Sequence, residues 1–454
     1  MKKLLLSGLV VLTASLSLNA QVVAIPDANF KAILIGDASI NTNMDTEIQI
    51  SEAVAYTGAI YCSSSAITDL TGIEAFVAIT SLYCDDNQLS SLNLSANVNL
   101  TEVVCNYNKI TSLNVSGNLL LTYLEAHSNV LTSFISVNAL ETVNLSYNPN
   151  LGNVDFNGMG NSLLDVQLSS CGMTALSLSN HPGLIFLTCD DNSISSLDLS
   201  SNTSLRTLNC ATNVITNLDV NGLTQMYELD FNNNAMTAVD LSTCTGLKKL
   251  IGHEGSLTSI DLTNNTILEE VFLYENNIVT FDLPISSTLF KLSIDNNDIV
   301  NFDASMLPGL KLLVIRNNAL TSLNVANGTN TIVTTFLISN NPNLTCVQVD
   351  DVAYSTTNWF DIDPTASYSL SCASTASVNE TEVVEFTMFP NPVSDVLNVV
   401  SSENIELVEI YDTYGKIVDS FNTSSFSVKH LNTGIYYITV TTQNGVAQGK
   451  FVKE

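Results

Sequence analysis

The sequence has few cations, since 14 Lys and Arg residues stand against 44 Asp and Glu among 454 residues. Removing a leader that contains Lys2 and Lys3 leaves a net charge of 12 − 44 = −32. A surface this acidic repels phosphate backbones, which argues against nucleic acid as a partner. The charges are not gathered in one block and 45% of the residues are hydrophobic, so we expect a folded protein.

Long apolar runs are also lacking after the first twenty residues. Lys2 and Lys3 precede the apolar stretch 4–18, and a short Leu-Asn-Ala segment ends at Ala20. This is the pattern of a secretory signal peptide, residues 1–20, cleaved after Ala20. No later segment is apolar for long enough to predict a transmembrane segment. The sequence therefore predicts an exported protein without a membrane span once the leader is removed.

Residues that build catalytic sites are scarce as well. The four His residues are widely separated along the chain, which argues against a convergent catalytic or metal site. We find no serine elbow, phosphate-binding loop or Cys–His pair. The sequence predicts that the protein is not an enzyme and has no cofactor, apart from one candidate calcium loop.

A repeat of about 21 residues dominates the chain. The copy that begins at Leu187 holds two alternating apolar runs, Leu-x-Cys and Leu-x-Leu, and an Asn marks the turn after each. Alternation places both runs in β conformation with one face inward. Since one copy cannot bury that face alone, the copies must stack. The pattern resembles the leucine-rich repeat, which implies a solenoid with parallel strands.

Alignment on the turn Asn gives about 14 repeats within residues 58–345, and a 21-residue copy leaves no room for a full helix in its second half. We therefore predict a mostly β solenoid with an extended second run. Residues 21–57 form an N-terminal cap with a helix at 25–34, and residues 346–372 form a C-terminal cap. A linker follows at 373–384, before a separate domain at 385–454.

Nine Cys residues in an exported protein raise the question of disulfides. Seven occupy inward or turn positions of the repeats, where we expect small buried hydrophobic residues. A link between Cys84 and Cys105 on neighbouring strands is left open. Only Cys346 and Cys372 lie outside the repeats, where they flank one compact segment, so they are the expected disulfide.

The N-terminal cap contains a loop that resembles an EF-hand calcium loop. Its oxygen-bearing side chains fall at the spacing of that loop, but Asn replaces the usual first Asp and Thr46 stands where Gly normally allows the sharp turn. The alternative is a capping loop rich in Asn and Asp. The candidate calcium ligands are Asn41, Asn43, Asp45, Glu47 and Glu52.

The chain from residue 385 changes its pattern to short apolar strands, with a hairpin signal at Asn444-Gly445. Its motifs include Pro390, Asn391, Pro392, Gly415, Lys416, Gly434 and Lys450. With these motifs the segment resembles the C-terminal sorting domain of type IX secretion substrates of the Bacteroidetes group. That resemblance implies an immunoglobulin-like β-sandwich read by the type IX secretion machinery at the outer membrane.

The same resemblance implies secretion across the outer membrane to the cell surface or the extracellular space. Residues 22–372 are similar to secreted leucine-rich repeat proteins that carry such tails. Together these features predict a protein that recognises or adheres to a protein or glycan. The alternative is a structural component of a surface layer without a specific ligand.

Outward residues of the first strand of each repeat are the candidate binding surface, because exposed aromatic groups on a rigid sheet favour contact with proteins or sugars. Packing between stacked neighbours is the alternative role of each one. The candidates are Tyr83, Tyr107, Tyr123, His127, Tyr147, Phe186, His253, Phe272, Tyr274 and Arg316.

Overall fold

The computed structural model describes residues 21–136, 140–159, 161–286, 288–372, 386–401, 403–413, 415–442 and 446–454. The predicted leader, the predicted linker and the Asn444-Gly445 turn lie outside the described residues. The chain divides into two units, Met1–Cys372 and Ala373–Glu454, and each is described by itself.

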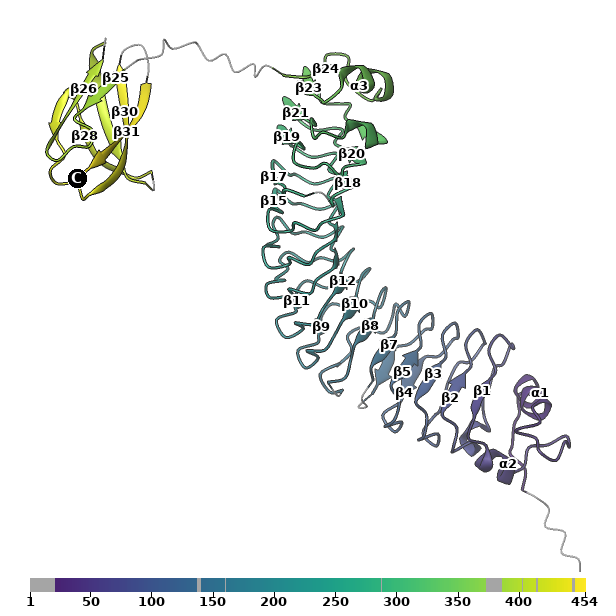
Figure 1. Ribbon diagram of the computed structural model, residues 1–454. Coiled ribbons are helices and arrows are strands. Elements are labelled where there is room, and N and C mark those ends of the chain that lie inside the picture. The colour runs from purple at the N-terminus through teal and green to yellow at the C-terminus, as the bar shows by residue number, and fades with distance from the viewer. Residues whose placement is uncertain are drawn as a thin grey trace, which may run out of the picture. The chain divides into compact units, whose positions relative to one another are not determined.

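The first unit is a solenoid built on a 14-stranded parallel sheet, which lies on the inner side of its arc (Figure 1). Each strand pairs with the equivalent strand of the next repeat, so that Leu187 is opposite Leu208. This confirms the predicted leucine-rich repeat fold. The strands are β1 (Ala59–Tyr61), β2 (Ser81–Tyr83), β3 (Glu102–Val104), β5 (Tyr123–Glu125), β7 (Thr142–Asn144), β8 (Asp165–Gln167), β10 (Phe186–Thr188), β12 (Thr207–Asn209), β13 (Glu228–Asp230), β14 (Lys249–Ile251), β16 (Glu270–Phe272), β18 (Lys291–Ser293), β20 (Leu312–Val314) and β22 (Thr335–Leu337).

One continuous apolar core runs through the stacked repeats. The middle residue of each strand and the residue after the strand point inward, as Leu187 and Cys189 do in the copy that begins at Leu187. Burying a Leu side chain stabilises the folded state by about 1.5–3 kcal/mol. Because every repeat buries such side chains against its neighbours, these contributions add up along the stack. All seven repeat Cys residues are free and buried, including Cys84 and Cys105. Burial raises the pKa of the Cys105 thiol to about 12, which keeps it in the neutral form of a small hydrophobic residue.

Most repeats have a turn Asn, which satisfies backbone groups that the tight coil leaves without partners; Ser65, Cys171 and Gly255 occupy this position in the other three. The Asn213 amide donates to the carbonyls of Cys189, Cys210 and Ala211, and its Oδ1 accepts from the Ile194 N–H. The residue before each turn position has a positive φ. The turn is therefore fixed by one left-handed residue in each repeat and, in most repeats, by a buried Asn side chain.

The second run of each repeat is extended, as predicted, but it pairs only in small groups. These strands lie on the outer side of the arc (Figure 1). Because hydrogen-bonded strands on the inner side are held ~4.8 Å apart while the outer side lacks a continuous ladder, the stack curves toward the large sheet. The outer strands are β4 (Ser112–Asn114), β6 (Ser133–Ile135), β9 (Leu176–Ser177), β11 (Leu197–Asp198), β15 (Ser259–Asp261), β17 (Thr280–Asp282), β19 (Asn301–Asp303) and β21 (Ser322–Asn324).

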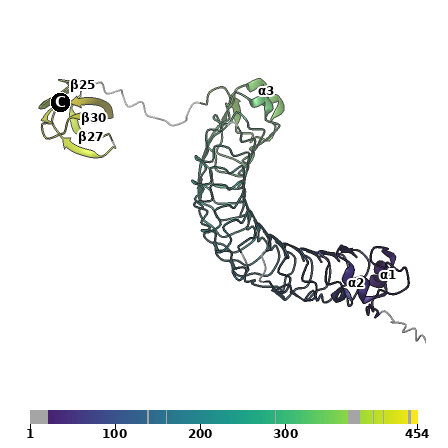
Figure 2. The ribbon, with the colours of Figure 1, turned by 60° about the horizontal axis from the view of Figure 1, so that its bottom comes forward.

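Helices close the two ends of the solenoid (Figure 2). At the start are α1 (Ala28–Gly36), α2 (Ile50–Ala55) and the 3-10 helix η1 (Ile73–Ala75). Asp27 caps α1 by accepting from the backbone of Asn29 and Phe30. The helix thus begins three residues after the predicted start, and Pro26 precedes the cap instead of lying in the first turn.

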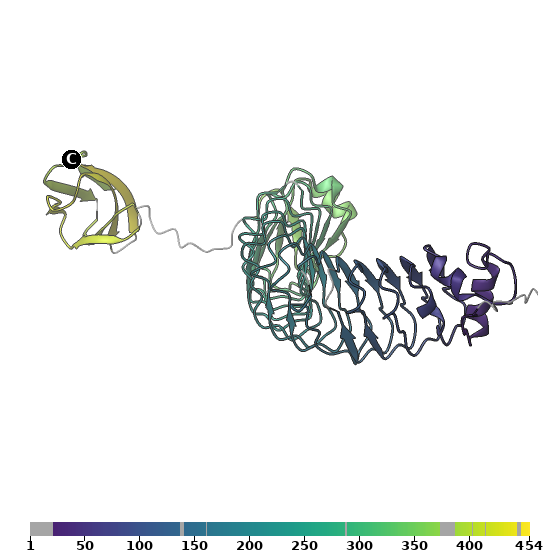
Figure 3. The same cartoon turned by 90° about the horizontal axis from the view of Figure 1, so that it is seen from below.

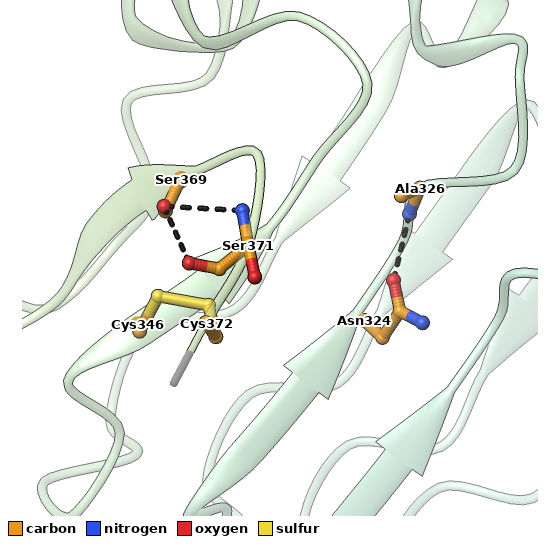
Figure 4. Close-up of a disulfide and its surroundings, with 6 residues drawn as sticks. All are labelled: Asn324, Ala326, Cys346, Ser369, Ser371 and Cys372. Carbon is orange, nitrogen blue, oxygen red and sulfur yellow. Dashed lines mark hydrogen bonds between the residues drawn. A yellow bond between two sulfur atoms is a disulfide. The ribbon is translucent and has the colours of Figure 1, made fainter. Parts of the chain in front are cut away.

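The 3-10 helix η2 (Asn330–Ile332) lies in the last repeat, before β22, and the C-terminal cap contains β23 (Cys346–Gln348), α3 (Val352–Asn358) and β24 (Ser367–Ser369). The sequence did not predict α3. Trp359, which directly follows α3, is buried and stacks on Phe336 with 4.0 Å between ring centroids. A disulfide joins Cys346 to Cys372, with 5.8 Å between their Cα atoms, beside a turn in which Ser369 bonds Ser371 (Figure 4).

The second unit is a small antiparallel β-sandwich with its own core. The Pro390–Pro392 motif and the last strand are joined, because the Asn391 side chain donates to the Lys450 carbonyl and accepts from the Val452 N–H. The strands are β25 (Phe386–Phe389), β26 (Val396–Ser401), β27 (Ile405–Tyr411), β28 (Ile417–Phe421), β29 (Ser425–Ser427), β30 (Gly434–Thr442) and β31 (Val446–Lys453).

Candidate functional site: the concave face of the solenoid

We define the concave face as the outward residues of the 14-stranded sheet, together with the outward residues that directly precede each strand and those of the turn that follows it. These residues form columns, because equivalent positions lie side by side in successive repeats (Figure 3). The acidic segment comprises the concave-face residues from β1 to the turn after β10, residues 59–191. The paired segment comprises those from residue 206 to the turn after β22, residues 206–340.

Two Tyr rings stack at the start of the acidic segment. Tyr61 and Tyr83 are opposite each other in neighbouring strands, with 4.8 Å between centroids and 4° between planes. Tyr61 is 68% exposed. The Tyr83 hydroxyl donates to Glu102 Oε2 at 2.7 Å. This bond, with burial and the Glu102 charge, raises the pKa of Tyr83 to about 12, so the phenol stays neutral.

The next repeats continue the pairing of rings with carboxylates. The Tyr123 hydroxyl donates to Glu125 Oε1 at 2.8 Å, and burial together with this carboxylate raises the pKa of Tyr123 to about 12. His127 Nε2 lies 3.8 Å from Glu125 Oε2. The edge of the His127 ring meets Tyr107 at 5.0 Å. Aromatic and acidic groups therefore alternate over four repeats.

Six of the ten candidates lie in the turn after the strand and not on the strand, which differs from the prediction; they are Tyr107, His127, Tyr147, His253, Tyr274 and Arg316. Tyr107 and Tyr147 directly precede the turn Asn and have φ of 52° and 58°. Both are exposed, at 58% and 57%. A left-handed residue in the turn points its side chain away from the sheet, which leaves these two rings at the rim of the concave face.

The acidic segment contains no Lys or Arg on the concave face. The single cation among residues 58–205 is Lys109, which comes after the turn Asn108. Most of the carboxylates accept hydrogen bonds from neutral donors, which are hydroxyl or amide groups. For example, the Ser63 hydroxyl donates to Asp85 and the Ser64 hydroxyl donates to Asp86. The eight carboxylates are Asp85, Asp86, Glu102, Glu125, Glu141, Asp165, Asp190 and Asp191.

The paired segment has the opposite organisation, since lysines neutralise carboxylates one repeat away. Lys249 binds Glu228 at 2.6 Å and Lys291 binds Glu270 at 2.7 Å. Lys248 also binds Glu269 at 2.7 Å. Six cations balance seven carboxylates here. The cations are Arg206, Lys248, Lys249, Lys291, Lys311 and Arg316, and the carboxylates are Glu228, Asp230, Glu254, Glu269, Glu270, Glu275 and Asp295.

Aromatic residues of the paired segment are largely engaged with neighbours. His253 stacks on Tyr274 at 4.2 Å, and lysine ammonium groups lie over the rings of Tyr227 and Phe290. Phe272 is partly buried in β16. Phe186 of β10 is exposed at 45%, opposite Thr207.

Arg316 lies at the C-terminal end of the concave face and binds the cap. Its Nε donates to Asp361 Oδ2 at 2.7 Å, and the Ser339 hydroxyl donates to the same carboxylate. Burial raises the pKa of Asp361, but the hydrogen bonds from Arg316 and Ser339 and the Arg316 charge outweigh burial and hold this pKa below its ordinary value. This ion pair gives Arg316 a structural role between the repeats and the cap.

Sequence reasoning missed Tyr61 and the separation of charge along the face. Tyr61 occupies the column of Tyr83, so alignment of the first strand with the second would have found it. Writing the outward columns of all repeats side by side would also have shown that the cations begin at Arg206.

The calcium candidates form a network of hydrogen bonds with one another. Glu52 caps α2 by accepting from the Gln49 N–H, and it also accepts from Thr42 and Asn43. Glu47 binds Lys31 at 2.7 Å. Asp45 accepts from the Asn43 and Gln49 side chains and from the Glu47 N–H. The Asn41 amide donates to the carbonyls of Ile35 and Asp45. Within the part of the chain that the structure describes, no group of three or more His, Cys, Asp or Glu could hold a metal ion.

The sorting motifs are turns and strand ends of the sandwich. Gly415, with φ of 77°, forms a turn in which its N–H donates to the Asp412 carbonyl, and the Lys416 N–H donates to the Asp412 side chain. Gly434 opens β30 and Lys450 lies in the adjacent strand β31.

Comparison with known structures agrees with the fold of the first unit. The functional domain of InlJ from Listeria monocytogenes, which includes a cysteine ladder, is 23% identical with a TM-score of 0.54, over 96% of this chain and 98% of that one. A leucine-rich repeat protein of Leptospira interrogans is 16% identical with a TM-score of 0.54, over 70% of this chain and 97% of that one. At these identities the likeness shows the fold alone. No curated protein sequence matches the chain.

The fold and the tail together define the class of protein. The chain has a leucine-rich repeat fold, and its residues 387–454 match the family described as the secretion system C-terminal sorting domain. This combination fits a repeat protein sorted by the type IX secretion system of the Bacteroidetes. This tail marks the chain for export across the outer membrane to the cell surface or the extracellular space. In the described residues, no helix is both long and apolar enough to span a membrane.

Proposed function

We propose that the solenoid acts outside the cell as a recognition module whose concave face binds a protein or glycan partner, in adhesion or a related contact. The observation that carries this proposal is the stacked pair Tyr61 and Tyr83, because Tyr61 is 68% exposed on a sheet that does not need it for core packing. Aromatic groups held on a rigid scaffold bind at a low cost in conformational entropy. We place the activity in binding and not in catalysis.

The proposal can be tested by measuring the binding of the full chain to a glycan array and to a set of surface proteins. We expect saturable binding that the double variant Tyr61→Ala, Tyr83→Ala weakens by roughly 2- to 10-fold, as loss of aromatic contacts worth about 0.5–1.5 kcal/mol would do. The matched control is Asn221→Ala on an exposed turn outside the concave face. Saturable binding to neither class would refute recognition and leave the structural surface-layer role.

A further inference from the structure

The acidic segment combines excess negative charge with exposed aromatic faces. We propose that it docks an extended polypeptide segment rich in Lys or Arg, supplied by a partner protein. This inference rests on the proposed recognition function and names the partner's chemistry.

The paired segment shows how this chain treats carboxylates on the same sheet. There, lysines one repeat away neutralise Glu228, Glu269 and Glu270. The acidic segment holds eight carboxylates in equivalent columns and no lysine or arginine. Because no lysine or arginine of the concave face neutralises these carboxylates, the acidic segment keeps an excess of negative charge. A cationic partner would neutralise this charge in the way that the lysines do in the paired segment.

The aromatic groups favour the same ligand. A Tyr ring face carries partial negative charge and attracts ammonium and guanidinium groups. Tyr83 and Tyr123 donate their hydroxyl protons to Glu102 and Glu125, which places a carboxylate at the edge of each ring. Arg or Lys side chains could therefore lie over a ring and reach a carboxylate at once, a geometry that suits the planar guanidinium best.

The length of the acidic segment favours a polypeptide over a small cation. Its seven strands, β1 to β10, span six intervals of ~4.8 Å, or ~29 Å. An extended chain of about nine residues covers this length at ~3.3 Å per residue. A neutral glycan could use the rings and donate hydroxyl hydrogen bonds to the carboxylates, but it would leave their net charge unneutralised, and an anionic glycan would be repelled.

The test uses the full chain and two nine-residue peptides, one alternating Arg and Ser and one alternating Gln and Ser. Fluorescence anisotropy at 150 mM salt measures their binding. We expect saturable binding of the Arg peptide with one site per chain and at least tenfold weaker binding of the Gln peptide. Equal binding of both peptides, or no saturable binding of the Arg peptide, overturns the inference.

Charge variants separate a local site from the general attraction of an acidic protein. In the acidic segment we remove three charges with Asp86→Asn, Glu102→Gln and Glu125→Gln, and expect about tenfold weaker binding of the Arg peptide. The matched control removes three charges from the paired segment with Glu254→Gln, Glu275→Gln and Asp295→Asn. We expect a loss of less than twofold in this control, and equal losses in the two variants overturn the inference.

The Tyr61 ring supplies a second test that does not depend on buried groups. Tyr61→Leu should weaken the Arg peptide about threefold, whereas Tyr61→Phe, which keeps the ring face, should bind within 1.5-fold of the original chain. Equal effects of the two substitutions overturn the cation–ring contact.

If a neutral glycan or another protein binds the solenoid while acidic-segment variants leave Arg-peptide binding unchanged, the inference fails and recognition stands. If nothing binds saturably, both fail.

Discussion

Replacing one turn Asn by Ala should lower the free energy of local opening of the solenoid. Asn213→Ala is the variant we develop, because all the hydrogen bonds of this side chain go to backbone groups. The Asn213 side chain makes four hydrogen bonds to backbone groups at 2.9–3.1 Å and is 8% exposed. Neighbouring turn residues also donate to two of its carbonyl partners, since Asn192 donates to Cys189 and Asn234 to Cys210. The Ile194 N–H has no other partner among the hydrogen bonds of the described residues.

The magnitude follows from this accounting. One buried N–H left without an acceptor costs about 1–3 kcal/mol, and losing the shared bonds adds a smaller amount. We therefore expect a loss of about 2–3 kcal/mol in the free energy of local opening, which is roughly a 30- to 140-fold loss of amide protection. Since repeats interact mainly with their neighbours, the loss should be concentrated around residues 187–234.

Hydrogen exchange measured by mass spectrometry on peptides from this stretch provides the assay. The control is Asn221→Ala, an exposed turn residue whose side chain has no hydrogen bond in the described structure and whose loss should change stability by less than about 0.5 kcal/mol. Equal protection around Ile194 in the two variants would refute the reasoning. A loss of amide protection spread evenly over all repeats would refute the expectation that the effect is confined to neighbouring repeats.

Two further predictions concern the ends of the chain. Deletion of residues 385–454 should leave the protein in the periplasm, as immunoblots of cell fractions would show, whereas normal export of the truncated chain would contradict the sorting role. Calcium at millimolar concentration should leave the melting temperature unchanged, because Glu47 and Glu52 already bind Lys31 and cap α2. A rise of several degrees that Glu52→Gln abolishes, with magnesium inactive as the control, would establish a calcium site in the loop.

Much of the fold could be read from the sequence because its signals are local and repeated. The inward Leu and Cys and the turn Asn of the copy that begins at Leu187 recur often enough to fix the strand, the turn and the stacking direction. The helix α3 escaped prediction because its sequence, Val352–Asn358, has little apolar periodicity. It is held by the Asp351 cap and by Trp359 packing on Phe336.

The candidate site was predicted less completely than the fold. Its side of the solenoid and the strand positions of Tyr83, Tyr123, Phe186 and Phe272 followed from alternation within the strands. The engagement of Arg316 with Asp361 joins residues far apart in the chain. Such a contact has no signal in a single repeat.

The sequence by itself determined the repeat, the stacked parallel sheet and the export tail, because each depends on residues close together in the chain. Only the tertiary structure decided which outward side chains meet. Tyr61 stacks on Tyr83, and Lys249 neutralises Glu228, because residues about 21 positions apart come within contact distance when the repeats stack. The individual contacts of the paired segment therefore form only when the strands lie side by side.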